Sequence, residues 1–366
     1  MGITNLIKEV KLSQTRPPRV TVLVDTYNSA QFVEEAIDSV LAQEFPPEQM
    51  EIIVVDDGSD DDTANRVRKY GERIQYLYKP NGGQASALNF GISRAAGEIV
   101  AFLDGDDYWL PGKLQSVASE FEKNPETGMV YHNFFYKREP AQNLEPANDL
   151  AGFSGFLPDN RNGLLNYDLY PTATLAFRRS VLQKLWPIPD SLVVQADAHL
   201  SACVVFIAPI RYVAQYLTVY RVHAGNLWNW GGNTPSDVNA FKGDPTARAR
   251  MMRRVITTRE IGVGVGHWLE KNGFDVNRPD VRAFLMQWKL SSNAAEFVLA
   301  PPGRLRFFRH LLDQSKYAAT RMTWRHEIVH YANALGSLFV GYRNFYLLDA
   351  GRMAIKRSIR SMLGRS

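Results

Sequence analysis

The stretch GEIVAFLDGDDYWLP, residues 97–111, decides the fold class of this 366-residue chain. It begins as a nearly continuous apolar run and ends in three aspartates within four positions. Continuous apolar runs are typical of parallel strands that are buried on both faces of a sheet. We therefore expect a buried strand here, followed at once by Asp104, Asp106 and Asp107.

Two earlier segments repeat this pattern. Residues 19–29, RVTVLVDTYNS, form an apolar β-branched run that ends in polar residues after Asp25. Residues 50–63, MEIIVVDDGSDDDT, form another, which ends at Asp56 and Asp57. Each run predicts a buried strand with polar side chains at its carboxyl end.

Helical periodicity lies between the predicted strands. Residues 30–43 place their apolar side chains on one stripe, with Ser29 as the predicted N-cap, and residues 84–95 form a second candidate helix. The order β-α-β-α-β predicts an α/β fold with a doubly wound, mostly parallel sheet. Ligands of such sheets bind beyond the carboxyl ends of the strands, which is where all three polar clusters fall.

Composition and charge limit the class of protein. The single cysteine, Cys203, cannot form an intramolecular disulfide and indicates a reducing compartment. The start of the chain is polar, without the pattern of a signal peptide, and no run approaches the roughly 18 apolar residues of a membrane span. We therefore expect a cytoplasmic protein.

Charge divides the chain into an acidic front and a basic back. Residues 1–247 carry 21 Lys and Arg against 30 Asp and Glu, a net −9, and residues 248–366 carry 21 against 8, a net +13. We predict an N-terminal segment at 1–18, a catalytic domain at 19–236 and a basic, mainly helical region at 237–366.

The tail 343–366 contains six Lys and Arg and one acid, with an apolar residue on almost every turn. Such a helix favours peripheral contact with an anionic membrane surface. A helix packed on its own domain is the main alternative, and a nucleic-acid partner is not expected.

Clustered carboxylates repel one another, so the aspartates at 104–107 need a counter-charge. Mn²⁺ and Mg²⁺ prefer oxygen ligands and commonly bridge carboxylates to phosphates. Asp104-Gly105-Asp106 fits such a site, and Gly105 would let two backbone segments approach closely. A simple turn after a strand is the alternative for this motif taken alone.

Several ordered motifs together identify a family. VTVLVDTYNSAQFVEEAIDSVLAQ, IIVVDDGSDDDT, NGGQASALNFGISRAAGEIVAFLDGDDYWLPGKL and YRVHAGN resemble the inverting GT-A-fold glycosyltransferases of family two, over roughly residues 18–226. The resemblance implies a GT-A sheet, a nucleotide-sugar donor, a divalent metal and an acceptor hydroxyl.

The same resemblance implies where the nucleotide binds. The end of the first strand is implied to hold it through Thr26, Tyr27 and Asn28, and Asp56 or Asp57 is implied to read the base. UDP is the expected nucleotide, with dTDP and GDP as alternatives.

Roles for the metal site follow in the same way. Asp104 is implied to lie near the ribose, Asp106 to ligate Mn²⁺ or Mg²⁺, and His223 to complete the metal or diphosphate site, with a structural contact as the alternative for the histidine. The family usually has Pro where this chain has Asp25, which adds an acid beside the nucleotide.

An inverting transfer needs a general base that comes from a segment other than the metal ligands. Asp197 matches the family's base, although Ala196 stands where many relatives have Glu. An N-cap for the following helix is the alternative role for Asp197. Arg221 is predicted to contact a phosphate or form a surface ion pair, and Lys79 to be an exposed edge lysine or a nucleotide contact.

Two loops are candidates for acceptor binding. Residues 137–171 are rich in Asn, Pro, Gly and Asp, and residues 225–236 carry Trp228 and Trp230 between glycines. Indole faces pack against sugar rings, although burial in a loop explains the tryptophans equally well.

A pattern of another class lies near the C-terminus. His326-Glu327-x-x-His330 is the zinc-protease motif, but no third His or Glu ligand follows in sequence, and its surroundings are basic. We predict an amphipathic helix there rather than a zinc site.

The expected function is therefore transfer of a sugar from a nucleoside diphosphate, UDP above all, to a glycan or lipid-linked hydroxyl in cell-surface polysaccharide synthesis. A nucleotidyltransferase and a non-catalytic carbohydrate-binding or scaffold protein are the alternatives. The first of these usually has a basic Gly-rich loop after its first strand, where this chain reads Asp25-Thr26-Tyr27-Asn28.

Overall fold

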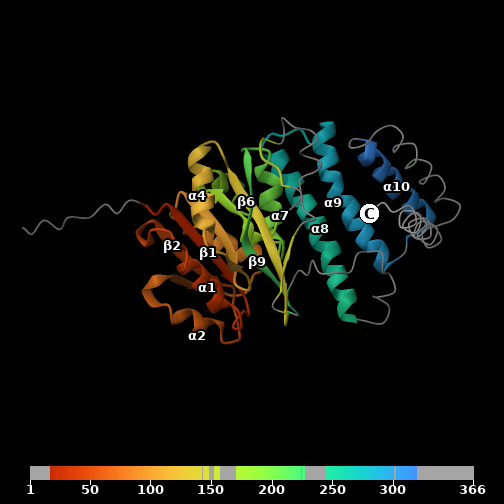
Figure 1. Ribbon diagram of the computed structural model, residues 1–366. Helices are drawn as coiled ribbons and strands as arrows, with labels where there is room; N and C mark the ends of the chain where they lie inside the picture. The colour runs from red at the N-terminus through yellow and green to blue at the C-terminus, as the bar shows by residue number, and fades with distance from the viewer. Residues whose placement is uncertain are drawn as a thin grey trace, which may run out of the picture.

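The computed structural model describes residues 17–141, 143–147, 152–156, 170–223, 225–226, 245–300 and 302–319. Within these residues a twisted sheet is covered by helices on both faces, and a group of long helices extends from one end of the sheet (Figure 1).

Four parallel strands form the first half of the sheet and contain the three predicted strands. In sheet order they are β3 (Gln75–Tyr78), β2 (Met50–Asp56), β1 (Val20–Thr26) and β4 (Ile99–Asp104). The register sets Asp25 opposite Asp104 and Thr26 opposite Asp56. The polar residues that follow the apolar runs therefore meet at one edge of the sheet.

The second half of the sheet is mixed. After β4 come β8 (Ala176–Arg178), β6 (Met129–Arg138), β9 (Ile210–Val222) and β5 (Tyr108–Trp109), and β7 (Leu144–Pro146) pairs with β6. Strand β8 is antiparallel to β4 and to β6, whereas β6 and β9 are parallel. The expectation of a doubly wound, mixed and mostly parallel sheet is confirmed.

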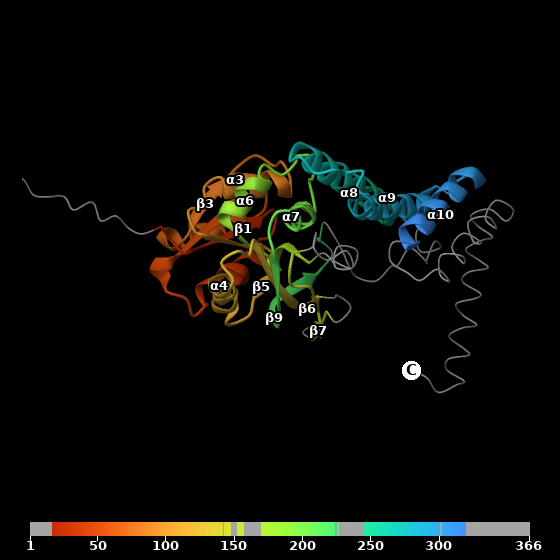
Figure 2. The same cartoon turned by 90° about the horizontal axis from the view of Figure 1, so that it is seen from above.

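Each face of the sheet packs on its own hydrophobic core. Leu23 of β1 joins the core shared with α3, α6 and α7, whereas Val22 and Val24 join the core shared with α1, α2 and α4. Figure 2 shows α3 and α6 on one side of the sheet and α4 on the other. Burial on both faces explains why the strands are continuously apolar. These helices are α1 (Val33–Leu41), α2 (Thr63–Arg68), α3 (Gln84–Ile92), α4 (Lys113–Lys123), α6 (Arg179–Leu185) and α7 (Ala196–Val204).

The predicted cap of α1 is wrong. The helix begins at Val33 with Phe32 at its N-cap, and no side chain caps it. The carbonyl of Ser29 instead accepts the N–H groups of Phe32 and Val33, at 2.8 and 2.9 Å. A turn therefore separates β1 from α1 and leaves residues 27–30 free to border the strand ends.

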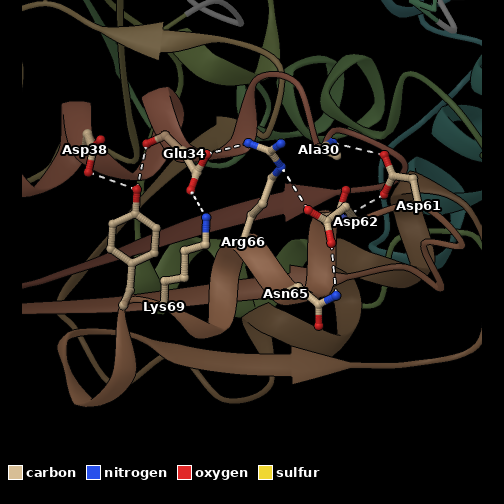
Figure 3. A network of polar contacts seen from close by, with 10 residues as sticks. Ala30, Glu34, Asp38, Asp61, Asp62, Asn65, Arg66 and Lys69 are labelled. Carbon is tan, nitrogen blue, oxygen red and sulfur yellow. Dashed lines mark hydrogen bonds and ion pairs between the residues drawn. The ribbon is translucent and has the colours of Figure 1, made fainter.

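Helices α1 and α2 are joined by a polar network (Figure 3). Glu34 accepts hydrogen bonds from Arg66 at 2.6 Å and Lys69 at 2.8 Å, and these two cations lower its pKa. Asp61 accepts the N–H of Ala30 at 3.0 Å. Each surface pair contributes little alone, but together they hold the loops after β1 and β2 side by side.

The C-terminal region is helical as far as it is described. It comprises α8 (Pro245–Lys271), α9 (Pro279–Leu299) and α10 (Arg304–Ala319). Ile261 and Val265 of α8 and Phe284 of α9 join the same core as α7, so α8 and α9 pack against the sheet domain, and α10 packs on α9 (Figure 1). In the part of the chain described, none of the helices combines the length and apolar character needed to cross a membrane.

Candidate active site

A cavity of about 920 Å³ opens at the carboxyl ends of β1 and β4. Its lining comes from the loops after these strands, from the segment 191–198 before and within α7, from the end of β9, and from one side of α8. The site therefore forms where the doubly wound topology predicts it.

The first-strand residues predicted to bind the nucleotide all line this cavity. Thr26 is buried, with no hydrogen-bond partner for its hydroxyl among the described residues, and Tyr27 is 41% exposed. Asn28 has a positive φ of 51°, and its side chain accepts the N–H of Asp60 at 2.9 Å. Tyr27 thus presents a ring for stacking, and Asn28 fixes the loop beside it.

The two aspartates that end β2 have different surroundings. Asp56 is fully buried, where it accepts the hydroxyl of Tyr76 at 2.7 Å and the N–H of Ser59 at 2.8 Å, and it lies outside the cavity lining. Asp57 lines the cavity. Of the two predicted base readers, Asp57 lines the cavity and Asp56 does not, and base reading by either stays a prediction.

Asp57 also organises the loop before α3. Its carboxylate accepts the N–H groups of Gly82 at 3.0 Å and Gly83 at 2.7 Å, and it pairs with Lys79 at 2.5 Å. The expected exposure of Lys79 is therefore wrong, since its side chain is only 14% exposed. The anion held at this glycine turn is therefore the protein's own carboxylate.

The close approach predicted at Gly105 is present. A Cβ on this residue would lie 2.5 Å from the hydroxyl of Thr26 and 3.3 Å from the carbonyl of Asp25. Gly105 also donates its N–H to that carbonyl at 2.8 Å. The end of β1 and the aspartates after β4 can thus share one site.

Several carboxylates of this site repel one another. The pKa values of Asp25 and Asp104 are raised well above 3.8, first by burial and then by the charges of neighbouring aspartates. One oxygen of Asp25 has no hydrogen-bond partner among the described residues. Oxygen ligands that lack a compensating cation fit Mn²⁺ or Mg²⁺.

The described residues do not form a complete metal cage. No group of three or more His, Cys, Asp or Glu side chains within them is arranged to hold an ion alone. Cations of this kind often take one or two carboxylates and complete their shell with phosphate oxygens and water. The site therefore fits a metal that arrives together with a diphosphate.

His223 contacts the predicted metal ligand. Its Nε2 lies 3.1 Å from Oδ2 of Asp106, which Asn226 also contacts at 3.2 Å. The N–H of Gly225 donates to Nδ1 of His223 at 3.1 Å. Because Nδ1 accepts, the neutral ring carries its proton on Nε2 and donates it to Asp106. In this arrangement His223 orients Asp106, and direct ligation by His223 remains a prediction.

Arg221 forms an ion pair rather than lining the cavity. Its guanidinium is 1% exposed, contacts Glu35, and donates to the carbonyl of Asp106 at 2.8 Å. The group lies 4.6 Å from the ring centre of Tyr108. Arg221 thus lies outside the cavity lining, and the ion pair predicted at the surface is buried on the arginine side.

Asp197 lies in the wall of the cavity, inside the first turn of α7. The N-cap of this helix is Gln195, so the alternative of a capping role for Asp197 does not hold. Burial raises the pKa of Asp197 to about 6, although hydrogen bonds from Ala198 and Thr172 lower it. A carboxylate with a pKa of about 6 is mostly ionised at neutral pH and is basic enough to accept a proton.

The sequence interpretation missed the wall that α8 contributes. Met252 and Ile256 are 44% and 53% exposed and line the cavity, together with Val193 at 54%. Arg253 lines it too, and no other Lys or Arg does so among the described residues. One side of the cavity is therefore acidic and the other largely apolar.

Other predictions lie outside the described residues. They concern Trp228 and Trp230, the motif His326-Glu327-x-x-His330, most of the loop 137–171 beyond residue 156, and the basic tail 343–366.

A doubly wound sheet with a carboxylate cluster at the carboxyl ends of β1 and β4, and a separate carboxylate across the cavity, agrees with the resemblance to GT-A glycosyltransferases. The model of the family described as Glycosyl transferase family 2 matches residues 21–186. An uncharacterized glycosyltransferase of Rickettsia typhi is 46% identical over 228 residues, which cover 62% of this chain and 71% of that protein. The chain belongs to glycosyl transferase family 2.

More distant matches include a further sequence relative and two solved structures of similar fold. An uncharacterized glycosyltransferase of Nostoc is 33% identical over 220 residues, 57% of this chain and 66%, just under two thirds, of that protein. The structure of S. aureus TarS 1–349 with UDP has a TM-score of 0.57 at 20% identity, covering 88% of this chain and 92% of that one. The mannosyltransferase PcManGT of Pyrobaculum calidifontis, with GDP-Man and Mn²⁺, has a TM-score of 0.50 at 19% identity, covering 96% and 88%.

Proposed function

We propose that this glycosyltransferase moves a sugar, with inversion, from a nucleoside diphosphate to an acceptor hydroxyl, and that it depends on a divalent metal. The observation that carries the proposal is one cavity in which Asp104 and Asp106 lie on the strand-end side and Asp197, from a distant segment, lies in the α7 wall. An in-line displacement needs these two groups of carboxylates on different sides of the reacting carbon.

UDP is the nucleotide we favour. Tyr27 offers an exposed ring beside the cavity, and Asp57 can accept a hydrogen bond from a base. TarS has been solved with UDP and with UDP-GlcNAc, whereas PcManGT has been solved with GDP-Man. Those complexes support a nucleotide-sugar donor for this fold, and UDP is our choice between the bases.

Asp106, with Asp104 beside it, would hold Mn²⁺ or Mg²⁺. The ion supplies charge neutralisation for the leaving diphosphate when it is bound. His223 and Asn226 both contact the carboxylate of Asp106 and so would keep it oriented toward the proposed metal position. The complex of PcManGT with Mn²⁺ supports a metal in this fold.

Asp197 would accept the proton of the acceptor hydroxyl as that oxygen attacks the anomeric carbon. Its pKa of about 6 keeps it ionised at neutral pH without making it a weak base. The bond from the acceptor oxygen forms as the bond to the diphosphate breaks, so one carboxylate and one leaving group suffice.

The α8 wall would receive the acceptor. Met252 and Ile256 can pack against the apolar face of a sugar ring or against a lipid chain, and Arg253 can pair with an acidic group. A glycan or lipid-linked hydroxyl fits this surface, as would be required in cell-surface polysaccharide synthesis. Peripheral membrane contact through the tail 343–366 belongs to the same proposal.

The test combines binding and turnover. Calorimetry with UDP, in Mn²⁺ and in EDTA, should show binding that depends on the metal, and a panel of UDP-, dTDP- and GDP-sugars should show hydrolysis of one donor. Asp197→Asn should abolish turnover while keeping UDP binding. Asp190→Asn, at an exposed aspartate before the same helix, is the matched control. Unchanged turnover in Asp197→Asn would remove Asp197 from its role.

A further inference from the structure

Gln84, the first residue of α3, lies between the strand ends that carry Asp104 and the cavity wall formed by α7. Its Nε2 donates to Oδ1 of Asp104 at 3.2 Å and to the hydroxyl of Thr172 at 3.1 Å. Its Oε1 accepts the N–H of Ala196, the first residue of α7, at 3.0 Å. The side chain of Gln84 therefore contacts both Asp104, at the strand ends, and the helix that carries Asp197.

The orientation of this amide is fixed by its partners. A backbone N–H can only donate, so the atom of Gln84 that faces Ala196 must be the oxygen, and the atom that faces Asp104 and Thr172 must be the nitrogen. The two hydrogens on Nε2 match the two acceptors.

The direction of the next bond follows from this. Since Gln84 can only donate from Nε2, the hydroxyl oxygen of Thr172 accepts, and its single hydrogen is available for another partner. The acceptor that fits is Asp197, whose pKa Thr172 lowers through its side chain and its backbone N–H, and whose neighbour Ala196 donates to the same Gln84 amide. Thr172 is 3% exposed, so its hydroxyl has little contact with bulk water.

The backbone of α3 is held in place at the same point. Gln84 donates its N–H to the carbonyl of Val193 at 2.8 Å, and Ala85 donates to the carbonyl of Leu192 at 3.2 Å. The segment before α7 is thus attached to the start of α3 by backbone bonds that no side-chain substitution removes.

We propose that Gln84 is a positioning residue that directs the hydroxyl of Thr172 toward Asp197 and so keeps the base ionised while it also holds Asp104. The role rests on the proposed function, because Asp197 is the base only in that function. Gln84 itself touches no reacting atom.

Other charged groups face Asp197 and must be considered. Asp25 of β1 and Asp104 of β4 interact with it electrostatically, as does the phenol of Tyr220 on β9, while Arg253 of α8 lines the same cavity. None of these groups changes when the hydroxyl of Thr172 is removed, so Thr172→Val isolates the proposed bond.

The test compares the wild type with Gln84→Glu, Thr172→Val and the double variant. A carboxylate at position 84 accepts from Thr172 instead of donating to it, which takes the hydrogen away from Asp197. In each single variant the apparent pKa of the acid limb of the pH–rate profile for nucleotide-sugar hydrolysis should rise by about one unit. This is the shift expected when a carboxylate loses one hydrogen bond. Thr172→Ser should keep the wild-type profile.

The double variant separates the proposal from simple repulsion. If Gln84 acts through Thr172, the shift in the double variant is smaller than the sum of the two single shifts. Additive shifts would show that the new charge acts directly on Asp197, and an unchanged profile in Thr172→Val would show that the hydroxyl does not matter. Either result overturns the proposal.

A second readout does not need turnover. Thermal unfolding of the same proteins in EDTA, from pH 4.5 to 7.5, reports the pKa of Asp197 through its effect on stability. The Thr172→Val variant should lose stability relative to wild type as the pH rises, again with a non-additive double variant. Absence of hydrolysis in every protein would reject the proposed function, while a flat, pH-independent difference in unfolding would reject the role of Gln84.

Discussion

Asp197→Asn should make the protein inactive. Relative to the wild type, this variant should also gain stability as the pH rises from acid to neutral. Burial raises the pKa of Asp197 from its ordinary 3.8 to about 6. The folded protein therefore binds a proton that the unfolded chain releases between these two values. Stability from this group is present below pH 3.8 and is lost as the pH rises through 6.

The magnitude follows from the two pKa values. A rise from 3.8 to about 6 corresponds to about 3 kcal/mol, because each pH unit is worth about 1.4 kcal/mol. Water in the cavity screens part of this energy, so half of it is a reasonable expectation. About 1.5 kcal/mol corresponds to a relative gain in Tm of roughly 2 °C for a chain of 366 residues, at an unfolding entropy of about 2.1 cal/mol/K per residue.

The measurement is the difference in Tm between Asp197→Asn and the wild type, followed in EDTA from pH 4.5 to 7.5. Comparing pH values removes any constant effect of lost hydrogen bonds. Asp61→Asn is the flat control, since hydrogen bonds from Thr63 and Ala30 lower the pKa of Asp61 below 3.8 against the effect of burial. Its carboxylate is ionised in both the folded and the unfolded protein over this range, so that variant should differ from wild type by a nearly constant amount. A difference for Asp197→Asn that is flat, or that falls with pH, would refute the reasoning.

Three further predictions concern the surroundings of the site. Asp106→Asn should weaken UDP binding about tenfold in Mn²⁺ and little in EDTA, since it removes a proposed metal ligand; calorimetry in the two buffers checks this, and equal losses in both would argue against ligation. Arg221→Met should lower the free energy of unfolding by about 2 kcal/mol, because the Asp106 carbonyl loses a buried donor. Urea denaturation should show a smaller loss, under about 1 kcal/mol, for Glu35→Ala, whose side chain is 56% exposed. Asp57→Asn should release the turn before α3 and increase amide exchange at Gly82 and Gly83, which now donate to this carboxylate; unchanged exchange would mean that the backbone alone holds the turn.

The sheet was predictable because its physical cause is written in consecutive residues. Strands buried on both faces must be continuously apolar, so 20–26, 50–56 and 99–104 could be read directly. The edge that carries the site then follows from topology, without knowledge of any contact.

The choice between Asp56 and Asp57 could not be made from sequence. Successive residues at the end of a strand point to opposite faces, so the outcome depends on where the strand stops and what lies beside it. Here Tyr76 on the neighbouring strand binds Asp56, and the glycine turn binds Asp57. Both partners are distant enough in sequence that no local pattern indicates them.

Gln84 and the α8 wall were missed for the same reason. The bonds of Gln84 join it to Thr172 and Ala196, 88 and 112 residues away along the chain. An amide at the start of a helix is unremarkable by itself, and an exposed Met or Ile on a long helix predicts nothing until the helix is placed against a cavity.

The family model matches only part of the residues that line the cavity. The matched family model ends at residue 186, so it covers the strand-end carboxylates but neither Asp197 nor α8. The half that we propose for the donor is therefore the half described by the shared pattern, and the half that we propose for the acceptor is built from later residues. The two halves meet at Gln84, inside the matched region, whose amide bonds Asp104 and Thr172 within that region and Ala196 beyond it. Donor experiments can therefore start from the family, whereas the acceptor must be sought through the apolar and basic side chains of α8.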